Sequence, residues 1–554
     1  METPSTRLVR HILVSTLAFL TAKEKTVRYR ATQTIAYVIN NITALDDDLY
    51  DLLRVALVKR LRDKDPPVRV QAVLGLGTLL GDEDDQQEDE DSDDDATGGL
   101  LEKLMNIMSN DPSAEVRRAV LHNLPRLPTT LRSILKRARD IDATLRRQVY
   151  GKILPTMGDF RHMSVVEREK LIRWGLRDRD DIVRKAAARL FSEKWLEDCA
   201  STHDSRPEEE KKPGEIAPPN LDALCELLER IDIIRSGEEE EGIAHEAMRR
   251  FWEGRPDYRD YITFDHDFWK NLDAQTAFIV RSLNDYAQVA QDDGIKQKVE
   301  DKMPEVTIFA FVLQKELRLL MELSTKVLLL EEDDPDFDEV QEDNDEREFV
   351  VQQLLHIAKS LDYTDEMGRR QVYNITREAI SQAQLPEECT KLAIEVLRIV
   401  CGVRGESDFC ALIVEAIAEV RDTLLDADDD AMATGEEGEE SFHSAQSDLD
   451  ADAPLIKPRA ANAKVLTEEE EQERQTREVL VHSKCLHIAQ CTLENVHCDL
   501  ESNSHLTSIL NTLIIPAVQA HQAILRERGV ICLGLAALLS KVSELILSNS
   551  KFHY

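Results

Sequence analysis

Apolar residues recur along this chain at intervals of three and four, the spacing that places side chains on one face of an α-helix. The clearest stripes follow two acidic turn residues, Asp65 and Asp111. Few segments alternate apolar and polar residues as a strand does, so the pattern predicts an all-helical protein. The two stripes consist of Val68, Ala72, Leu76, Leu79 and Leu80, and of Val116, Ala119, Val120 and Leu124.

A short motif recurs at the start of successive helices. In it, an acidic turn residue is followed by an apolar residue, an arginine and a new apolar run. The apolar positions are spaced by 41, 48, 29 and 38 residues, which is the irregular period of HEAT arrays. We therefore expect each copy to begin the second helix of a helix pair. The five apolar positions are Val27, Val68, Val116, Leu145 and Val183.

The same motif indicates how neighbouring pairs are joined. Asp65 and Asp111 are expected to cap helices by accepting from free backbone N–H groups, with Pro66 and Pro112 at the first helical position. The arginine after each apolar position is expected to pair with turn aspartates between repeats, forming a structural ladder. The ladder arginines are Arg28, Arg69, Arg117, Arg146 and Arg184.

The predicted fold class is an all-α HEAT-repeat solenoid, a curved superhelix of antiparallel helix pairs with disordered acidic loops. The last helices lack a polar cap, so we expect the array to be truncated. The predicted parts are basic N-terminal repeats at 1–200 with an acidic insert at 81–97, a linker at 201–219, divergent repeats at 220–424 with an acidic insert at 331–348, a disordered acidic linker at 425–465, and further repeats at 466–554.

Motifs of catalysis are missing from the sequence. There is no phosphate-cradling glycine loop, no HExxH and no GxSxG, so we predict no enzyme and no cofactor. The glycines of LGLGTLL at 74–80 are expected to permit close helix packing. The cysteines at 485, 491 and 498 are six and seven residues apart, a spacing that favours ordinary helix positions over a zinc site. Scattered cysteines and short apolar runs predict an intracellular protein without a membrane span.

Charge is distributed unevenly. The formal net charge is −38, which by itself favours a basic partner. Residues 1–80 carry +4 and residues 101–190 carry +9, whereas residues 81–97 hold eleven acidic residues and no basic one. A basic body beside an acidic loop is the charge pattern expected of a phosphate-binding surface.

Several basic residues are candidates for that surface. Arg118, Arg147 and Lys185 occupy the same motif position in three repeats and would form a row along the solenoid. No aromatic residues interleave them, so we expect contacts with backbone phosphates of double-stranded DNA, independent of sequence. The alternative is that they are solvated surface positions. The further candidates are Arg132, Lys136 and Arg139 on one helix face, Lys170, Arg173 and Arg177 on another, and Lys59, Arg60, Arg62 and Lys64.

Several long segments resemble the condensin complex subunit 3 family, the Cap-G type HEAT-repeat subunits. The resemblance runs in order from about Val27 to Leu539, and the family continues beyond this C-terminus. The segments include VRYRATQTIAYVINNI, LVKRLRDKDPPVRVQAVLGLGTL, NDPSAEVRRAVLHNLP, WGLRDRDDIVRKAAARL and REFVVQQLLHIAKSLDYTDEMGRRQV.

The resemblance implies a non-catalytic condensin subunit that binds the kleisin subunit and double-stranded DNA during mitotic chromosome condensation and cell division. It implies that the chain is linked to the SMC ATPase subunits indirectly, through the complex. It also implies a location in the nucleus and on mitotic chromosomes, with a cytoplasmic pool. Kleisin-contacting residues do not follow from the sequence. The alternatives are a carrier or chaperone solenoid that holds a basic cargo protein through its acidic loops, and a phosphatase-type scaffold.

The acidic loop itself leads to a prediction. A polyanion tethered between basic repeats has an effective concentration in about the millimolar range, so deleting 81–97 should tighten DNA binding at low salt. The gain should shrink as salt screens both interactions. Ser92, followed by three aspartates, is a possible phosphosite, and phosphate there would add roughly −1.5 to −2 of charge and strengthen the competition. Fluorescence anisotropy at two salt concentrations measures this, and equal low-salt affinities would show that the loop is only a spacer.

Overall fold

The computed structural model describes residues 4–42, 46–80, 99–204, 206, 216–236, 242–330, 334–402, 405–433 and 468–540. All regular elements in these ranges are helices, as the apolar spacing predicts. The chain divides into two compact units, Met1–Ile262 (unit 1) and Thr263–Tyr554 (unit 2). The acidic insert at 81–97, with Ser92, lies outside the described residues.

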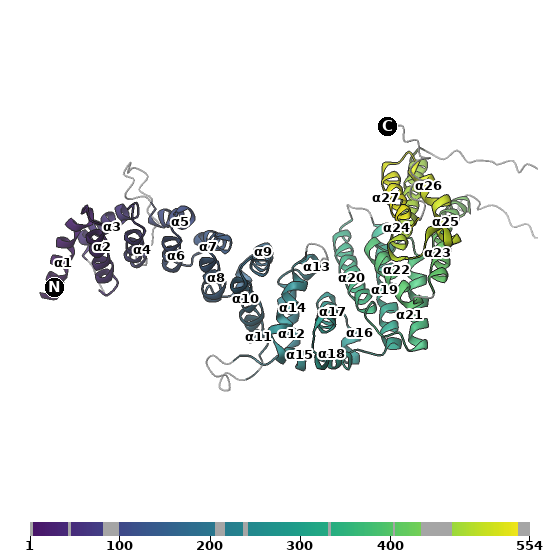
Figure 1. Cartoon of the computed structure of the whole chain (residues 1–554), viewed down its shortest axis with the longest axis horizontal. Helices are drawn as coiled ribbons and strands as arrows, with labels where there is room; N and C mark the ends of the chain where they lie inside the picture. Colours follow the sequence, from purple (N-terminus) through teal and green to yellow (C-terminus); the bar gives the residue numbers. More distant parts are fainter. Residues whose placement is uncertain are drawn as a thin grey trace, which may run out of the picture. The chain divides into compact units, whose positions relative to one another are not determined.

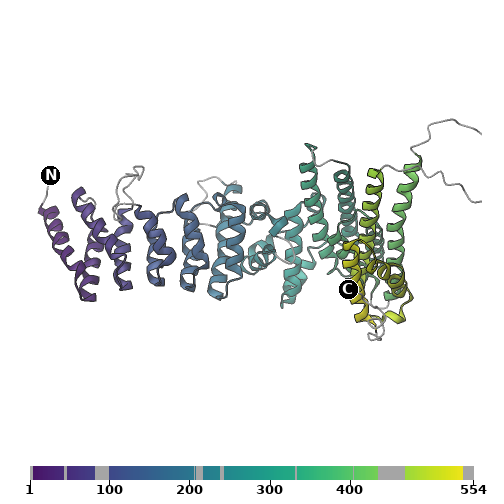
Figure 2. The ribbon, with the colours of Figure 1, turned by 90° about the horizontal axis from the view of Figure 1, so that it is seen from above.

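Unit 1 is a stack of short helices in chain order (Figures 1 and 2). Its helices are α1 (Pro4–Leu17), η1 (Ala18–Thr21), α2 (Lys25–Ile39), α3 (Asp47–Arg60), α4 (Pro66–Leu79), α5 (Leu100–Asn110), α6 (Ala114–Asn123), α7 (Pro128–Leu135), η2 (Lys136–Arg139), α8 (Ala143–Gln148), η3 (Val149–Ile153), η4 (Leu154–Thr156), η5 (Phe160–His162), α9 (Val165–Leu176), α10 (Asp181–Arg189), η6 (Leu190–Trp195), α11 (Leu196–His203), α12 (Leu221–Glu229), α13 (Ile233–Ser236), α14 (Ala244–Gly254) and α15 (Pro256–Tyr261).

Unit 2 contains longer helices, in which α19, α20 and α21 pack together and α22, α24 and α27 come after them (Figure 1). Its helices are α16 (His266–Lys270), α17 (Ala274–Val289), α18 (Asp293–Glu300), α19 (Val306–Leu329), α20 (Phe337–Ala358), α21 (Glu366–Ile380), α22 (Glu387–Cys401), α23 (Glu406–Ala433), α24 (Glu468–Asn495), η8 (Leu500–Ser502), α25 (Ser504–Ile509), η9 (Leu510–Ile514), α26 (Ile515–Val518) and α27 (Ala523–Leu539).

The second helices of successive pairs bury the predicted stripes. α4 packs between α2 and α6, and Val68, Leu76 and Val116 are fully buried. A Cβ added at Gly75 would lie 3.0 Å from Leu57, and one at Gly77 would lie 2.8 Å from Asn123. These glycines therefore allow the close helix packing that the sequence predicts. In contrast, Leu80 and Ala119 are half-buried and Val27 is 37% exposed.

Four ladder arginines join one repeat turn to the next through buried ion pairs. Arg117 illustrates the geometry: Nε and Nη2 donate to Asp140 at 2.9 and 2.6 Å, while Nη1 donates to the Asp111 carbonyl at 2.7 Å. Burial raises the pKa of Asp140, but the hydrogen bonds from Arg117 and the Asp142 N–H outweigh it and hold that pKa below its usual value. The equivalent pairs are Arg28 with Asp63 and Asp65, Arg69 with Asp111, and Arg146 with Asp178.

The fifth arginine ends the ladder. Arg184 donates to the Asp178 carbonyl of its own turn, as the others do, but its carboxylate partner is Asp181 of its own helix at 3.1 Å. Its guanidinium therefore does not reach a following turn.

The predicted caps at Asp65 and Asp111 are wrong. Neither carboxylate caps a helix, because Asp65 accepts from Arg28 at 2.6 Å and Asp111 accepts from both Arg69 and the Ser113 N–H. Pro66 does begin α4, whereas Pro112 precedes the N-cap of α6. A buried guanidinium is a stronger competitor for these oxygens than a free backbone N–H.

Two acidic segments are more ordered than the sequence predicts. The insert predicted at 331–348 is helical from Phe337 onward as part of α20, where Asn344 is buried and accepts from Ser324 at 2.9 Å. Its acidic residues occupy mostly the outer face, so like charge does not prevent the helix. The acidic linker predicted from 425 is helical to Ala433 at the end of α23.

The predicted linker at 201–219 does not coincide with the boundary between the two units, which lies after Ile262. α12 packs against α11, and Arg161 of η5 donates to Glu226 of α12 at 2.9 Å. These contacts place the helices on either side of the polar stretch in the same compact unit.

We predict that Arg117→Glu lowers stability and leaves DNA binding almost unchanged. The substitution breaks a buried ion pair and puts a second carboxylate beside Asp140, which keeps only Arg137 at 3.2 Å as its cation, and breaking such a pair costs about 3–5 kcal/mol. The matched control is the neighbouring Arg118→Glu, whose side chain is 30% exposed and 3.9 Å from Asp142. Thermal unfolding followed by circular dichroism should show a large drop only for Arg117→Glu. Intact stability with weakened DNA binding would assign Arg117 to the DNA surface instead.

Candidate nucleic-acid interface

A hollow of about 700 Å³ lies between two neighbouring second helices of unit 1. One wall is α8 with η3 and the other is α10 with η6, which pack against each other. The Arg146–Asp178 ladder pair joins the turns at the start of these walls and so fixes their spacing. We call the hollow the basic groove, because its charged lining is Arg147, Lys152, Lys185, Arg189 and Lys194 against the single acid Glu193.

The charges in the basic groove are only partly neutralised. Lys185 pairs with Asp181 at 2.7 Å and is 72% exposed, and Lys194 pairs with Asp198 at 2.5 Å. Arg147, Lys152 and Arg189 are exposed and make no ion pair within the part of the chain that the structure describes. Exposed cations on opposite walls of one hollow can contact successive phosphates of a polyanion.

Two π-helical turns shape the basic groove. Lys152 lies five residues after Arg147, and Lys194 lies five residues after Arg189. Such a spacing places two side chains on different faces of an α-helix, but η3 and η6 are π-helices, whose hydrogen bonds span five residues. The expanded turns bring both members of each pair to the same hollow. The sequence pattern therefore missed Lys152 and Lys194, whereas the four-residue spacing of Lys185 and Arg189 was a visible signal.

The predicted row is only partly assembled. Arg147 and Lys185 line the basic groove together, but Arg118 does not line it and lies 3.9 Å from Asp142. Arg60 is committed to the ladder turn, where it pairs with Asp63 at 3.1 Å and donates to the Leu20 carbonyl. The other predicted cations lie outside the basic groove; Arg173 is half-buried, and the exposed ones are Lys59, Arg62, Lys64, Arg132, Lys136, Arg139, Lys170 and Arg177.

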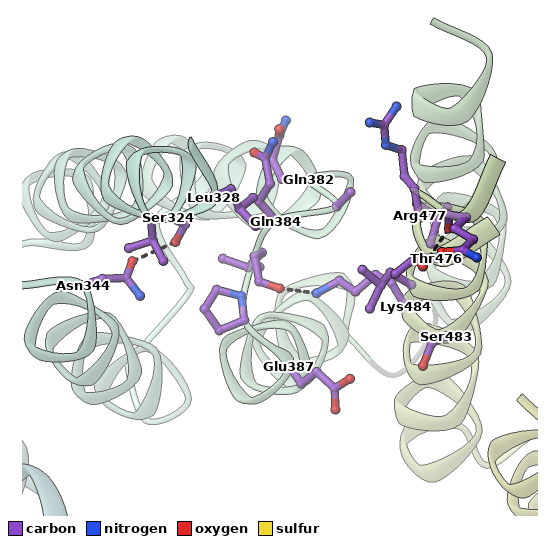
Figure 3. Close-up of a pocket in the computed structure, with 17 residues that line it drawn as sticks. Ser324, Leu328, Asn344, Gln382, Gln384, Glu387, Thr476, Arg477, Ser483 and Lys484 are labelled. Atoms are coloured by element: carbon purple, nitrogen blue, oxygen red, sulfur yellow. Dashed lines mark hydrogen bonds between the residues drawn. The ribbon is translucent and has the colours of Figure 1, made fainter. Parts of the chain in front are cut away.

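Unit 2 carries a second, mostly apolar groove of about 1160 Å³ (Figure 3). It lies among the end of α19, the α21–α22 connection and the first turns of α24, and Leu328 and Leu480 expose 70% and 65% of their surfaces in it. We call it the apolar groove. Exposed leucines that share one hollow are typical of protein-binding surfaces.

One wall of the apolar groove holds a buried lysine. Lys484 reaches from α24 to the α21–α22 connection, where its ammonium donates to the Leu385 carbonyl (Figure 3). The same ammonium donates to Thr390 Oγ1 of α22. Burial lowers the pKa of Lys484 to about 8. Its hydrogen bonds tie α24 to the α21–α22 connection and to α22.

Neither a metal centre nor a membrane span is evident among the described residues. No group of three or more histidine, cysteine or acidic side chains there could hold a metal ion, although His487 and Cys491 lie 3.5 Å apart. None of the described helices combines the length and apolar character needed to cross a membrane.

Comparison with known proteins gives consistent matches. A family model described as nuclear condensing complex subunits, C-terminal domain, matches residues 484–550. Condensin complex subunit 3 of Schizosaccharomyces pombe is 33% identical over 97% of this chain and 55% of the relative, and that of Saccharomyces cerevisiae is 29% identical over 96% and 50%. The chain thus spans about half the length of these relatives.

A solved structure agrees with these matches. The crystal structure of the S. pombe condensin Cnd3–Cnd2 subcomplex is 31% identical, with a TM-score of 0.72 over 99% of this chain and 57% of that chain. The prediction of a HEAT-like helical solenoid is thereby confirmed. With the sequence matches, this likeness shows that the chain belongs to the condensin complex subunit 3 family.

Proposed function

We propose that this chain acts as a non-catalytic condensin subunit that binds double-stranded DNA through the basic groove and a kleisin subunit through unit 2. Its action would be in chromosome condensation, in the nucleus and on mitotic chromosomes. The observation that carries the DNA part is the basic groove, where five cations face one acid between two laddered repeats.

The chemistry of the groove supports contact with phosphates. Arginine and lysine head groups are the usual donors to phosphate oxygens, and such contacts release counterions without reading base sequence. No aromatic side chain other than Tyr150 lines the groove, and Tyr150 is fully buried with its hydroxyl donating to the Leu171 carbonyl. Base stacking is therefore not available at this surface.

The kleisin part is supported by the relative and by the apolar groove. The S. pombe relative was crystallised with its Cnd2 subunit. The apolar groove offers exposed Leu328 and Leu480 beside Arg477, a combination that suits an extended peptide segment. The alternative of a carrier for basic cargo has the opposite electrostatic requirement, because the groove in unit 1 is lined by cations.

We predict that Arg147→Glu combined with Lys185→Glu weakens duplex DNA binding equally for different sequences. The slope of log affinity against log salt should fall by about one for each phosphate that the variant leaves unneutralised. Adding Arg118→Glu should have a smaller effect, because Arg118 already lies near Asp142. The matched control is Arg235→Glu with Arg249→Glu, which reverses two charges on exposed side chains outside the groove. A folded double variant with an unchanged salt slope would remove the groove from the DNA surface.

A second prediction tests the kleisin part. Leu480→Asp should weaken binding of a purified Cnd2-type kleisin segment by about 2 kcal/mol or more, because a charge would enter an apolar contact. Leu538→Asp on α27 is the control, since Leu538 is 83% exposed and outside the groove. Isothermal titration calorimetry measures both. Equal affinities of the two variants and the unaltered chain would exclude the apolar groove as the kleisin site while leaving the DNA proposal untouched.

A further inference from the structure

A second hollow, of about 550 Å³, lies at the repeat turns of unit 1 and shares no lining residue with the basic groove. It is bounded by η2, the turn before α8, the C-terminal half of α9 and the turn before α10. We call it the turn pocket. Its distinguishing residues are Arg139, Ile141, Arg173, Trp174, Arg177 and Arg179.

The turn pocket has a surplus of positive charge. Its two acids, Asp140 and Asp178, are already held by the ladder arginines Arg117 and Arg146. Two of the other four arginines have carboxylate partners outside the lining, Glu169 for Arg173 and Glu246 for Arg177, so the surplus charge is that of Arg139 and Arg179.

These guanidinium groups are held in place by neighbours. Arg139 lies over the ring of Trp174 at 5.4 Å from its centroid. Arg177 donates to the Gly242 carbonyl at 2.9 Å and lies 3.5 Å from a carboxylate oxygen of Glu246, and Arg179 donates to the Ile141 carbonyl at 3.2 Å. Arg173 pairs with Glu169 at 2.5 Å. An arginine has five donors in a fixed plane, so Arg139 and Arg179 keep donors after these contacts, and a bound anion would meet pre-positioned partners.

An exposed apolar side chain favours a phosphorylated peptide over a DNA backbone as the source of the phosphate. Ile141 lines the turn pocket and is 84% exposed, and Trp174 next to it is half-buried. A duplex backbone offers nothing to an isoleucine, whereas a peptide can place an apolar residue there beside its charged one.

We propose that the turn pocket binds a phosphoserine or phosphothreonine of a peptide, with the phosphate held by Arg139 and Arg179 and a flanking apolar residue resting on Ile141. Clusters of arginines are the usual means of recognising phosphorylated peptides. The site is independent of the proposed DNA and kleisin roles, and it would let a phosphorylated partner bind while the basic groove is occupied.

The test uses the full chain and an array of matched phosphorylated and unphosphorylated peptides. The expected result is a set of phosphopeptides that bind at least about tenfold more tightly than their unphosphorylated counterparts. In fluorescence anisotropy, Arg139→Glu combined with Arg179→Glu should remove that preference, and Arg235→Glu with Arg249→Glu should keep it. Ile141→Asp should weaken binding of the same peptides, and because Ile141 is exposed, this substitution should leave the fold intact.

Three outcomes would overturn the proposal. One is an array without any phosphate-dependent binder. Another is loss of peptide binding in the groove variant Arg147→Glu with Lys185→Glu to the same extent as in the pocket variant, which would indicate general charge attraction. The third is a pocket variant that loses duplex DNA affinity and keeps its phosphopeptides, which would assign the turn pocket to the DNA surface.

Discussion

The buried ion pair between an arginine of one repeat and an aspartate of the next turn determines the geometry of unit 1. Each such arginine also binds the carbonyl of its own turn, and each aspartate also accepts the N–H two residues later. One side chain thus ties together the conformation of two turns and the distance between two helix pairs. Because each repeat of a solenoid contacts only its neighbours, this spacing is passed along the array one junction at a time.

The ladder explains why the fold was readable from the sequence. The arginine and the aspartates recur at recognisable positions, and the apolar stripes such as Val68 and Leu76 are continuous. The helix caps were misread because Asp65 and Asp111 have two possible partners, and a sequence does not show that a buried guanidinium from another repeat is near. The acidic start of α20 was misread for a related reason, since its helix depends on packing against α19 rather than on its own charges.

The candidate sites were less predictable than the fold. The sequence identified Arg147 and Lys185 because they occupy repeated motif positions, but Lys152 and Lys194 enter the basic groove only through π-helical turns. The turn pocket was harder still, because Arg139 and Trp174 come from different helix pairs and are brought together by the ladder spacing. The apolar groove is lined by residues of α19, the α21–α22 connection and α24, which are far apart in the sequence.

The π-helical turns mean that the spacing of the groove cations has to be read together with the local helix type. In an α-helix, a lysine five residues after Arg147 would point about 140° away from it, at about 100° per residue, and would leave the groove although no residue had been substituted. Removing one residue between Arg147 and Lys152 and restoring an α-helical turn would instead place the lysine four residues after the arginine, on the same helix face. Relatives with a single-residue gap in η3 or η6 are therefore expected to keep this surface, and a change of turn type at unchanged length is expected to alter it.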